Sequence, residues 1–403
     1  IIKNPASMKK VVLLYSKNLT DPTGASAVIR ILNDNIPLFQ QNNIHLSVYS
    51  RDRFVQTNQM EKSHSWLGNV KLKISDFLAN TAKTNSLAAY LSIYIKSIRP
   101  AKKLVNYYLK QAEDAEIVFI HEIFTCYEYI KRRKTHNKII FVMHSNGETF
   151  KMERIYYKNF AKSCFYRHLL QIERTVLSNI DKIGFVASMP TGHFKNLHPD
   201  FLPENVFYVY NGLPSCCSKR NFASDKRNIE ISCIGTVNER KGQRFIVETL
   251  NILNTTGSLP EIHFTIIGDG AIKNELEILV KKYNIEKYIS FIGNSNKVTE
   301  YLLQSDIFIL PSLDEGFPIA ILEAMRASLP IVSTKVGGIP EMLENGVNGI
   351  FIDPSTKGVC DFISNINNYD WKAMGEKSYQ IFLEKFTVKT MIDSYSSVMN
   401  QLS

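Results

Sequence analysis

Two glutamates eight positions apart, Glu315 and Glu323, flank a turn whose residue types suit the recognition of sugar and phosphate. A carboxylate that accepts hydrogen bonds from two neighbouring hydroxyls recognises a sugar or a ribose in a defined orientation. Between them, Gly316 permits a tight turn, and Pro318 suits the first position of a helix, where its missing N–H costs nothing. The pattern predicts a strand-to-helix turn with one carboxylate before the helix and one inside it.

The start of this expected helix also offers backbone donors. The N–H groups of Phe317, Ile319 and Ala320 lack helical partners there, and together with the helix dipole they form a site for phosphate. At a rise of about 1.5 Å per residue, Glu315 and Glu323 stand up to ~12 Å apart. That separation is close to the distance from a donor sugar to a ribose across a diphosphate.

The elements around this turn are short apolar strands that alternate with amphipathic helices. Because the strands are apolar without alternation, we expect both faces to be buried in a parallel sheet, as in a doubly wound α/β domain. The expected strands are 231–234, 263–267, 289–292, 307–310, 331–333 and 349–352, and the expected helices are 243–253, 272–282, 298–303 and 319–327.

The first half of the chain repeats this pattern, with expected strands at 11–15, 46–49, 117–120, 139–143, 183–187 and 206–209, and one long helical region over 150–178. With 403 residues the chain is too long for one ordinary core. We predict Rossmann-like domains over 8–215 and 216–370, facing a cleft, and a C-terminal helix over 371–403 that packs back on the first domain. Ligands are expected at the carboxyl ends of the strands.

Six ordered motifs make residues 233–354 similar to the retaining glycosyltransferases of family 4, which have the GT-B fold. Glu315 and Glu323 form the E-x7-E motif of that family, a weak signal alone. The other motifs are GTVNERKG (235–242), IGDG (267–270), FIG (291–293), Asp306 before a strand that ends in PS (311–312), and GGIPE (337–341).

This resemblance implies roles for individual residues of the second domain. Glu315 would contact hydroxyls of the donor sugar, Glu323 would bind the ribose, and Lys241 would stabilise the departing diphosphate. The family often carries an arginine where this chain has Thr236. Arg240 would then supply the second positive charge, unless it is only a solvated cation at the start of a helix.

The resemblance also implies ligand contacts for three further residues, each of which has an alternative interpretation. Gly293 would approach the nucleobase through its backbone, or would merely end a strand. Gly24 would lie near the donor phosphates, although this chain has only one of the two glycines that the family usually carries there. His144 would lie beside the reacting sugar, or would be a structural histidine at a strand end. The neighbouring pair His121-Glu122 is a weaker candidate for contact with the acceptor.

The implied reaction is transfer of a sugar with retention of anomeric configuration, with His144, Lys241 and Glu315 as the catalytic residues. Because no carboxylate is an evident nucleophile, we expect a front-face reaction in which the departing diphosphate helps to deprotonate the acceptor hydroxyl. No metal and no cofactor are expected, and a UDP-sugar is favoured as donor. The acceptor would be a saccharide or a lipid-linked molecule in bacterial surface polysaccharide or lipopolysaccharide assembly. The alternative is a catalytically weak scaffold that binds sugar nucleotides, which Thr236 and the single Gly24 favour.

The charge is divided unevenly along the chain. Residues 1–220 hold 31 Lys and Arg against 16 Asp and Glu, whereas the remainder holds 17 against 22. A basic half indicates an anionic partner. The stretch 151–174 interleaves basic and aromatic residues and suits contact with an anionic membrane, unless its aromatics pack on the first domain. Nucleic acid is the less favoured partner, since no module that reads it is recognisable.

Composition adds a few limits. No run reaches the roughly 18 apolar residues that a membrane span needs, and the six cysteines show no C-x-x-C spacing, which suits a reducing compartment and argues against zinc. We expect a cytoplasmic protein, either free or bound peripherally at the inner face of the plasma membrane. Met8 is taken as the natural start, and residues 1–7 are left out of the fold.

Overall fold

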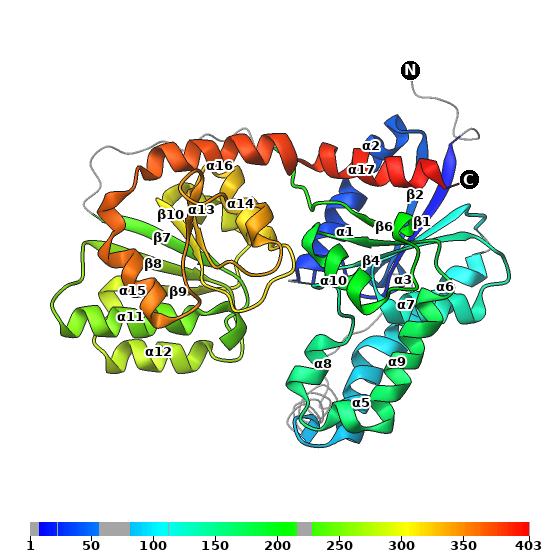
Figure 1. Ribbon diagram of the computed structural model, residues 1–403, viewed down its shortest axis with the longest axis horizontal. Coiled ribbons are helices and arrows are strands. Elements are labelled where there is room, and N and C mark those ends of the chain that lie inside the picture. Colours follow the sequence, from blue (N-terminus) through cyan, green and yellow to red (C-terminus); the bar gives the residue numbers. More distant parts are fainter. Residues whose placement is uncertain (1–7, 22, 56–80, 112, 216–227, 403) are drawn as a thin grey trace. The chain divides into compact units, whose positions relative to one another are not determined.

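A computed structural model describes residues 8–21, 23–55, 81–111, 113–215 and 228–402. The chain forms two compact units, one of residues up to Val209 together with Ile392–Ser403, and one of Tyr210–Met391. Each unit contains, in its described residues, a six-stranded parallel sheet (Figure 1). Residues 1–7, and residues 216–227 near the expected domain boundary, lie outside the described part of the chain.

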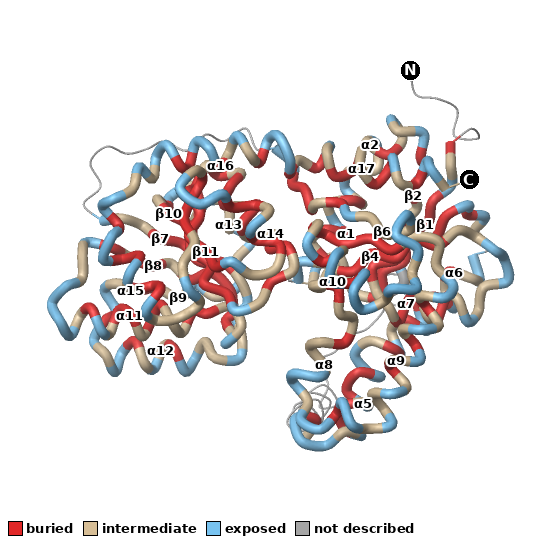
Figure 2. The backbone as a smooth tube through the Cα atoms, in the orientation of Figure 1, coloured by how far each residue is buried: buried red, intermediate tan, exposed pale blue. Residues whose placement is uncertain are grey.

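The first sheet has the strand order β2-β1-β3-β4-β5-β6. Parallel pairing places Val11 of β1 opposite both Leu46 of β2 and Ile117 of β3. The central strands are buried along their whole apolar run, as expected for a sheet covered on both faces (Figure 2). The strands are β1 (Lys9–Tyr15), β2 (Ile44–Ser50), β3 (Ile117–Ile120), β4 (Lys138–Met143), β5 (Lys182–Phe185) and β6 (Val206–Tyr208).

Helices connect these strands, and local signals fix where several of them begin. Thr23 caps the first helix, since its hydroxyl accepts from the N–H of Ser26. The helices are α1 (Gly24–Asp34), α2 (Ile36–Gln41), α3 (Arg51–Val55), α5 (Ser86–Ile93), α6 (Arg99–Gln111), α7 (Ile123–Arg132), α8 (Lys151–Tyr156), α9 (Cys164–Leu177) and α10 (Met189–Leu197). A π-helical segment, Tyr94–Ile98, joins α5 to α6.

The prediction of one long helix over 150–178 is wrong. The chain leaves α8 after Tyr156, and Asn159 adopts a left-handed conformation with φ of 62°. Tyr157 is already extended, with φ of −109° and ψ of 104°. Asn159 then turns the chain, because asparagine tolerates the left-handed conformation better than most residues. Ser163 then caps α9 through a hydrogen bond from the N–H of Tyr166.

The second sheet has the order β12-β11-β10-β7-β8-β9. Its strands are β7 (Ile229–Ile234), β8 (Ile262–Ile267), β9 (Ile289–Gly293), β10 (Ile307–Leu310), β11 (Ile331–Ser333) and β12 (Gly349–Phe351). The helices are α11 (Gln243–Thr255), α12 (Lys273–Lys282), α13 (Val298–Gln304), α14 (Ile319–Arg326), α15 (Thr356–Ser364) and α16 (Trp371–Lys385). Because β7 lies between β8 and β10, the loops after these three strands emerge side by side at the carboxyl edge.

The expected C-terminal helix consists of two helices, α16 and α17 (Val388–Gln401). Between them Thr387 forms a bridge with Leu213. The last residues pack on the first unit, as predicted. Lys9 Nζ donates to the carbonyl of Met399 at 3.1 Å, and the ring of Tyr395 lies 5.1 Å from that of Phe119. Among the described residues, no helix is both long enough and apolar enough to span a membrane.

Candidate active site

Glycines shape the loop that follows β7. Gly242 has φ of +74°, and a Cβ at this position would lie 2.0 Å from the carbonyl oxygen of Pro311. Gly268, after β8, approaches as closely, since a Cβ there would lie 2.1 Å from the carbonyl oxygen of Gly235. Asn238 caps the short turn Glu239–Lys241 by accepting from the N–H of Lys241. These close backbone contacts hold Lys241 against the loop that follows β10.

Lys241 and Glu315 form an ion pair at this point. Their Nζ and Oε1 atoms are 2.6 Å apart, and the two side chains are only 12% and 5% exposed. Ser312 donates to the same carboxylate oxygen at 2.7 Å. The carboxylate thus lies outside helix α14, as predicted, but it is buried against the lysine rather than open to solvent.

Arg240 adds a second cation to the same carboxylate. Its Nη1 lies 3.5 Å from Glu315 Oε2 and donates to the backbone carbonyl of Asp314 at 2.6 Å. The interpretation of Arg240 as a merely solvated cation is therefore wrong. Thr236, at the position where the family often carries an arginine, is exposed. Two cations around one buried carboxylate leave an excess of positive charge, which favours an anionic ligand.

The amino end of α14 lies directly after Glu315. The helix begins at Ile319, and Pro318 is its cap rather than its first residue, because its ψ of 116° is extended. Among the described residues, the N–H groups of Phe317, Ile319 and Ala320 have no hydrogen-bond acceptor. The predicted donors are thus available to a ligand, as the binding of a phosphate at the amino end of a helix requires.

Some groups around this turn hold the structure together, and others remain accessible to a ligand. Phe317 is buried and stacks on Tyr210, with ring centroids 5.3 Å apart, so only its backbone can serve a ligand. The carbonyl of Gly316 accepts from the N–H of Gly338 at 2.7 Å, which fixes the turn. Glu323 lies in the second turn of α14 and is partly buried.

Gly293 and Gly24 occupy loop positions in different units. Gly293 ends β9 with φ of +77°, and its carbonyl accepts from the N–H of Gly268, while no atom lies within 4 Å of an added Cβ. This open backbone next to the loop after β8 suits the predicted approach of a base. Gly24 is the exposed first residue of α1 in the first unit.

His144 forms a pair with His121 at the carboxyl ends of β3 and β4. His121 Nδ1 and His144 Nε2 lie 2.8 Å apart. His121 is buried, whereas His144 is partly exposed. Glu122, the neighbour of His121, accepts from the N–H of Ser16 at 2.5 Å and from Thr125 at 3.0 Å. Its carboxylate therefore ties β1 to α7 instead of standing free for an acceptor.

Both imidazoles are held neutral. Burial lowers the pKa of His144 to about 4, and the positive charge of Lys17 acts in the same direction. Burial also lowers the pKa of His121 well below its ordinary value, with a further contribution from His144. At neutral pH His144 is thus a hydrogen-bonding group and not a cation.

These shifts predict a pH dependence of folding stability. The unfolded chain takes up protons on these histidines below pH about 6.5, whereas folded His144 does so only near pH 4. Stability that is present above pH 6.5 should therefore be lost as pH falls toward 4, by about 2–3 kcal/mol for His144. We expect His144→Gln to weaken this loss in denaturation measured across pH, and an undiminished loss in that variant would contradict the assignment.

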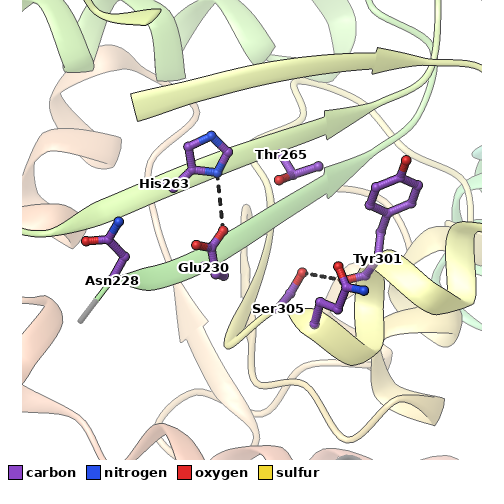
Figure 3. Close-up of a pocket in the computed structure, with 7 residues that line it drawn as sticks. Asn228, Glu230, His263, Thr265, Tyr301 and Ser305 are labelled. Atoms are coloured by element: carbon purple, nitrogen blue, oxygen red, sulfur yellow. Dashed lines mark hydrogen bonds and ion pairs between the residues drawn. The ribbon is translucent and has the colours of Figure 1, made fainter. Parts of the chain in front are cut away.

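A separate cavity of about 700 Å³ lies in the second unit (Figure 3). It is lined by Glu230 and His263, whose Oε2 and Nδ1 atoms are 3.2 Å apart, and by Ser305, which donates to the carbonyl of Tyr301. These residues lie at the amino ends of β7, β8 and β10. Ligands of parallel sheets bind at the opposite edge, where Lys241 and Glu315 lie, so we take that edge as the active site.

The observed roles of two residues in these clusters were not predicted from the sequence. Ser312 was noted only as part of a strand-end motif, yet it shares the Glu315 carboxylate with Lys241. His121 was considered only for acceptor contact, yet it anchors His144. Among the described residues, no group of three or more His, Cys, Asp or Glu side chains is arranged to hold a metal ion.

The two parallel-sheet units define a protein of the GT-B fold, with a cationic ligand centre at the carboxyl edge of the second sheet. A solved structure with this fold, Anabaena Alr3699/HepE in complex with UDP, matches 98% of this chain and 100% of its own, with a TM-score of 0.68 and 16% identity.

The comparisons by sequence agree with the fold. Residues 218–363, less than half of the chain, match the family described as glycosyl transferases group 1. The amylovoran biosynthesis glycosyltransferase AmsK of Erwinia amylovora is 34% identical over 30% of this chain and 31% of its own length. An Escherichia coli protein, UDP-Gal:alpha-D-GlcNAc-diphosphoundecaprenol alpha-1,3-galactosyltransferase, is 31% identical over 32% of this chain and 34% of its own. These matches cover about a third of each curated relative.

Proposed function

We propose that this chain is a retaining, metal-independent glycosyltransferase of family 4 that moves a sugar from a nucleotide-diphosphate donor to a saccharide or lipid-linked acceptor. The observation that carries the proposal is the buried Glu315 carboxylate between Lys241 and Arg240, directly before the open N–H groups of α14. UDP is favoured as the nucleotide by the UDP complex of HepE. The names of AmsK and the E. coli relative favour bacterial surface polysaccharide assembly.

The ion pair supplies a way to couple donor binding to sugar recognition. In the structure, Glu315 neutralises Lys241 at 2.6 Å. A diphosphate beside Lys241 and Arg240 would draw these cations toward its own oxygens, since it carries more negative charge than a carboxylate. Glu315 would then be released to accept hydrogen bonds from sugar hydroxyls, while Glu323 binds the ribose. Gly293 would face the base and Gly24 the phosphates.

The transfer step follows from these positions. The bond between the anomeric carbon and the diphosphate oxygen breaks, and Lys241, Arg240 and the N–H groups of α14 stabilise the developing negative charge. The acceptor oxygen bonds to the anomeric carbon on the same face, and its proton passes to the departing phosphate oxygen. Fixed cations thus serve where other transferases use a divalent ion. Neutral His144, with Nε2 engaged by His121, offers Nδ1 to a sugar hydroxyl.

We also propose that the protein is cytoplasmic and touches an anionic membrane through its basic first half. Within 151–174 the structure limits which residues can take part. Phe150 and Phe160 are buried in the core that includes α5 and α9. Ile155 and Tyr156 of α8 are 60% and 55% exposed and lie next to Arg154. Ile155 and Tyr156 are thus the large apolar side chains of this stretch that are exposed enough to enter a lipid surface.

The proposal is tested by release of nucleotide diphosphate from UDP-, GDP- and ADP-sugars by the intact chain and by Glu323→Ala. We expect slow cleavage of one donor without acceptor, and weaker binding of that donor by the variant, by about tenfold. Glu384→Ala, at an exposed position of α16, serves as the matched control and should behave as the unaltered chain. Equal affinity of the Glu323 and Glu384 variants would remove Glu323 from the donor site.

A further inference from the structure

A second concave site lies in the first unit, at the carboxyl edge of its sheet. The cavity has a volume of about 530 Å³, and its lining includes Ser16, Arg51, Ile95, Lys96, Arg99 and Lys103. Ser16 directly follows β1, and Arg51 directly follows β2. The other residues belong to the π-helical segment and to the first turns of α6. This is the edge at which parallel sheets bind ligands.

The cations of this pocket have no acidic partner among the residues that the structure describes. Lys96, Arg99 and Lys103 are spaced by three and four residues, which places them on one face of a continuous helical path, where like charges repel. Within the described residues, none of the three, nor Arg51, forms an ion pair with a carboxylate. Elsewhere in the unit, cations such as Arg132 and Arg154 do have acidic partners. Four cations around one concavity, without acidic partners in the described part of the chain, favour an anion inside it.

The backbone around the pocket is also unusual. The segment Tyr94–Ile98 is π-helical, an irregularity that is rare and is frequent at functional sites. It carries Lys96 and brings this lysine to the same pocket as Arg99 and Lys103. Two arginines and two lysines match the oxygens of a phosphate or diphosphate, because guanidinium groups bind such oxygens in pairs. The volume is ample for a diphosphate and the first atoms attached to it.

The pocket is connected to the histidine pair through consecutive residues. Ser16 lines the pocket and donates its N–H to Glu122, which directly follows His121. Lys17, the next residue, lies 4.0 Å from the Glu122 carboxylate and is close enough to His144 to act on its pKa. A molecule with its anionic group in the pocket would therefore extend along this edge toward His144.

We propose that this pocket binds the phosphate or diphosphate group of the acceptor substrate and so selects a phosphorylated acceptor. The assignment of the ligand as the acceptor rests on the proposed function, in which His144 lies beside the reacting sugar. The anion site itself rests only on the pocket and its charges. Ile95, which is 46% exposed at the rim, would contact whatever apolar portion the phosphate carries.

The test compares two double variants of α6 with equal charge change. Arg99→Gln with Lys103→Gln removes two pocket cations, whereas Lys102→Gln with Lys110→Gln removes two cations that are exposed as well but do not line the pocket. Inorganic pyrophosphate is titrated into each intact chain by calorimetry. Any binding at Lys241 is common to all chains. We expect the pocket variant to lose one site or to weaken it about tenfold, and the control variant to bind as the unaltered chain does.

Two further measurements are made on the same chains. Vesicle binding distinguishes a membrane surface from a phosphate ligand, and donor cleavage tests the proposed function separately from the anion site. Vesicles of phosphatidylglycerol and phosphatidylcholine are offered to the same chains. Loss of vesicle binding with unchanged pyrophosphate binding would assign these cations to a membrane surface and overturn the pocket. Unchanged binding of both probes would overturn it as well. Donor cleavage without acceptor should persist in the pocket variant. If no chain cleaves a donor, the acceptor assignment fails with the proposed function, while the pyrophosphate result still decides the anion site.

Discussion

Replacing Lys241 by methionine is expected to slow cleavage of the nucleotide-sugar donor by about 10²–10³-fold, because a fixed cation beside the departing diphosphate is lost. Methionine keeps most of the side-chain volume, so the loops after β7 and β10 remain packed. Arg240, 3.5 Å from Glu315, would retain part of the positive charge. Release of nucleotide diphosphate measures the effect, and activity close to that of the unaltered chain would remove Lys241 from the reaction.

The same substitution should show in folding stability, because the ion pair is nearly buried. Removing one member of a buried pair leaves the other charge poorly compensated, at a cost of up to about 3–5 kcal/mol. For Lys241→Met, Arg240 at 3.5 Å from Glu315 reduces this cost. We expect Lys241→Met and Glu315→Gln each to destabilise the chain, and the double variant to be less unstable than the sum of the two. Additive effects in chemical denaturation would show that the two groups do not interact in solution.

The second large effect is expected at Gly242, the residue that follows Lys241. An alanine Cβ would lie 2.0 Å from the carbonyl oxygen of Pro311, and φ of +74° is unfavourable for any residue with a side chain. Because backbone must move to make room, we expect Gly242→Ala to cost about 3 kcal/mol or more and to displace Lys241. Both thermal stability and donor cleavage should fall.

Gly257 provides a matched control just beyond the other end of α11. It has φ of +66°, but no atom lies within 4 Å of an added Cβ. Gly257→Ala should therefore cost only the backbone strain, about 1 kcal/mol, and should leave donor cleavage unchanged. If the two alanine variants have the same melting temperature, the close contact between Gly242 and the loop after β10 does not constrain the active site.

Several elements could be predicted residue by residue from the sequence. Strands 117–120, 307–310 and 331–333 lie where they were expected, because each is an apolar run with sharp polar or proline boundaries. The break within 150–178 had no such signal, since Asn159 turns the chain without glycine or proline. Local sequence therefore defines strands well, and it defines a helix interruption poorly when no glycine or proline marks it.

The contacts that build the sites depend on strand order, which the sequence does not give directly. Lys241 and Glu315 are far apart in the chain, and they meet because β7 and β10 are neighbours in the sheet. In the same way, Arg51 joins Lys96, Arg99 and Lys103 at one pocket only through the position of β2. The family resemblance supplied the roles of Glu315 and Lys241. It gave no indication of their ion pair.

The central claim is that this chain cleaves a nucleotide-diphosphate sugar at the centre formed by Lys241 and Glu315. The most direct measurement is release of nucleotide diphosphate from a panel of UDP-, GDP- and ADP-sugars in the presence of a chelator, by the intact chain and by Lys241→Met. We predict that one donor is cleaved without metal and that the variant is slower by about two orders of magnitude or more. Failure to cleave any donor, together with no donor that raises the melting temperature, would contradict the assignment and favour a protein without transferase activity.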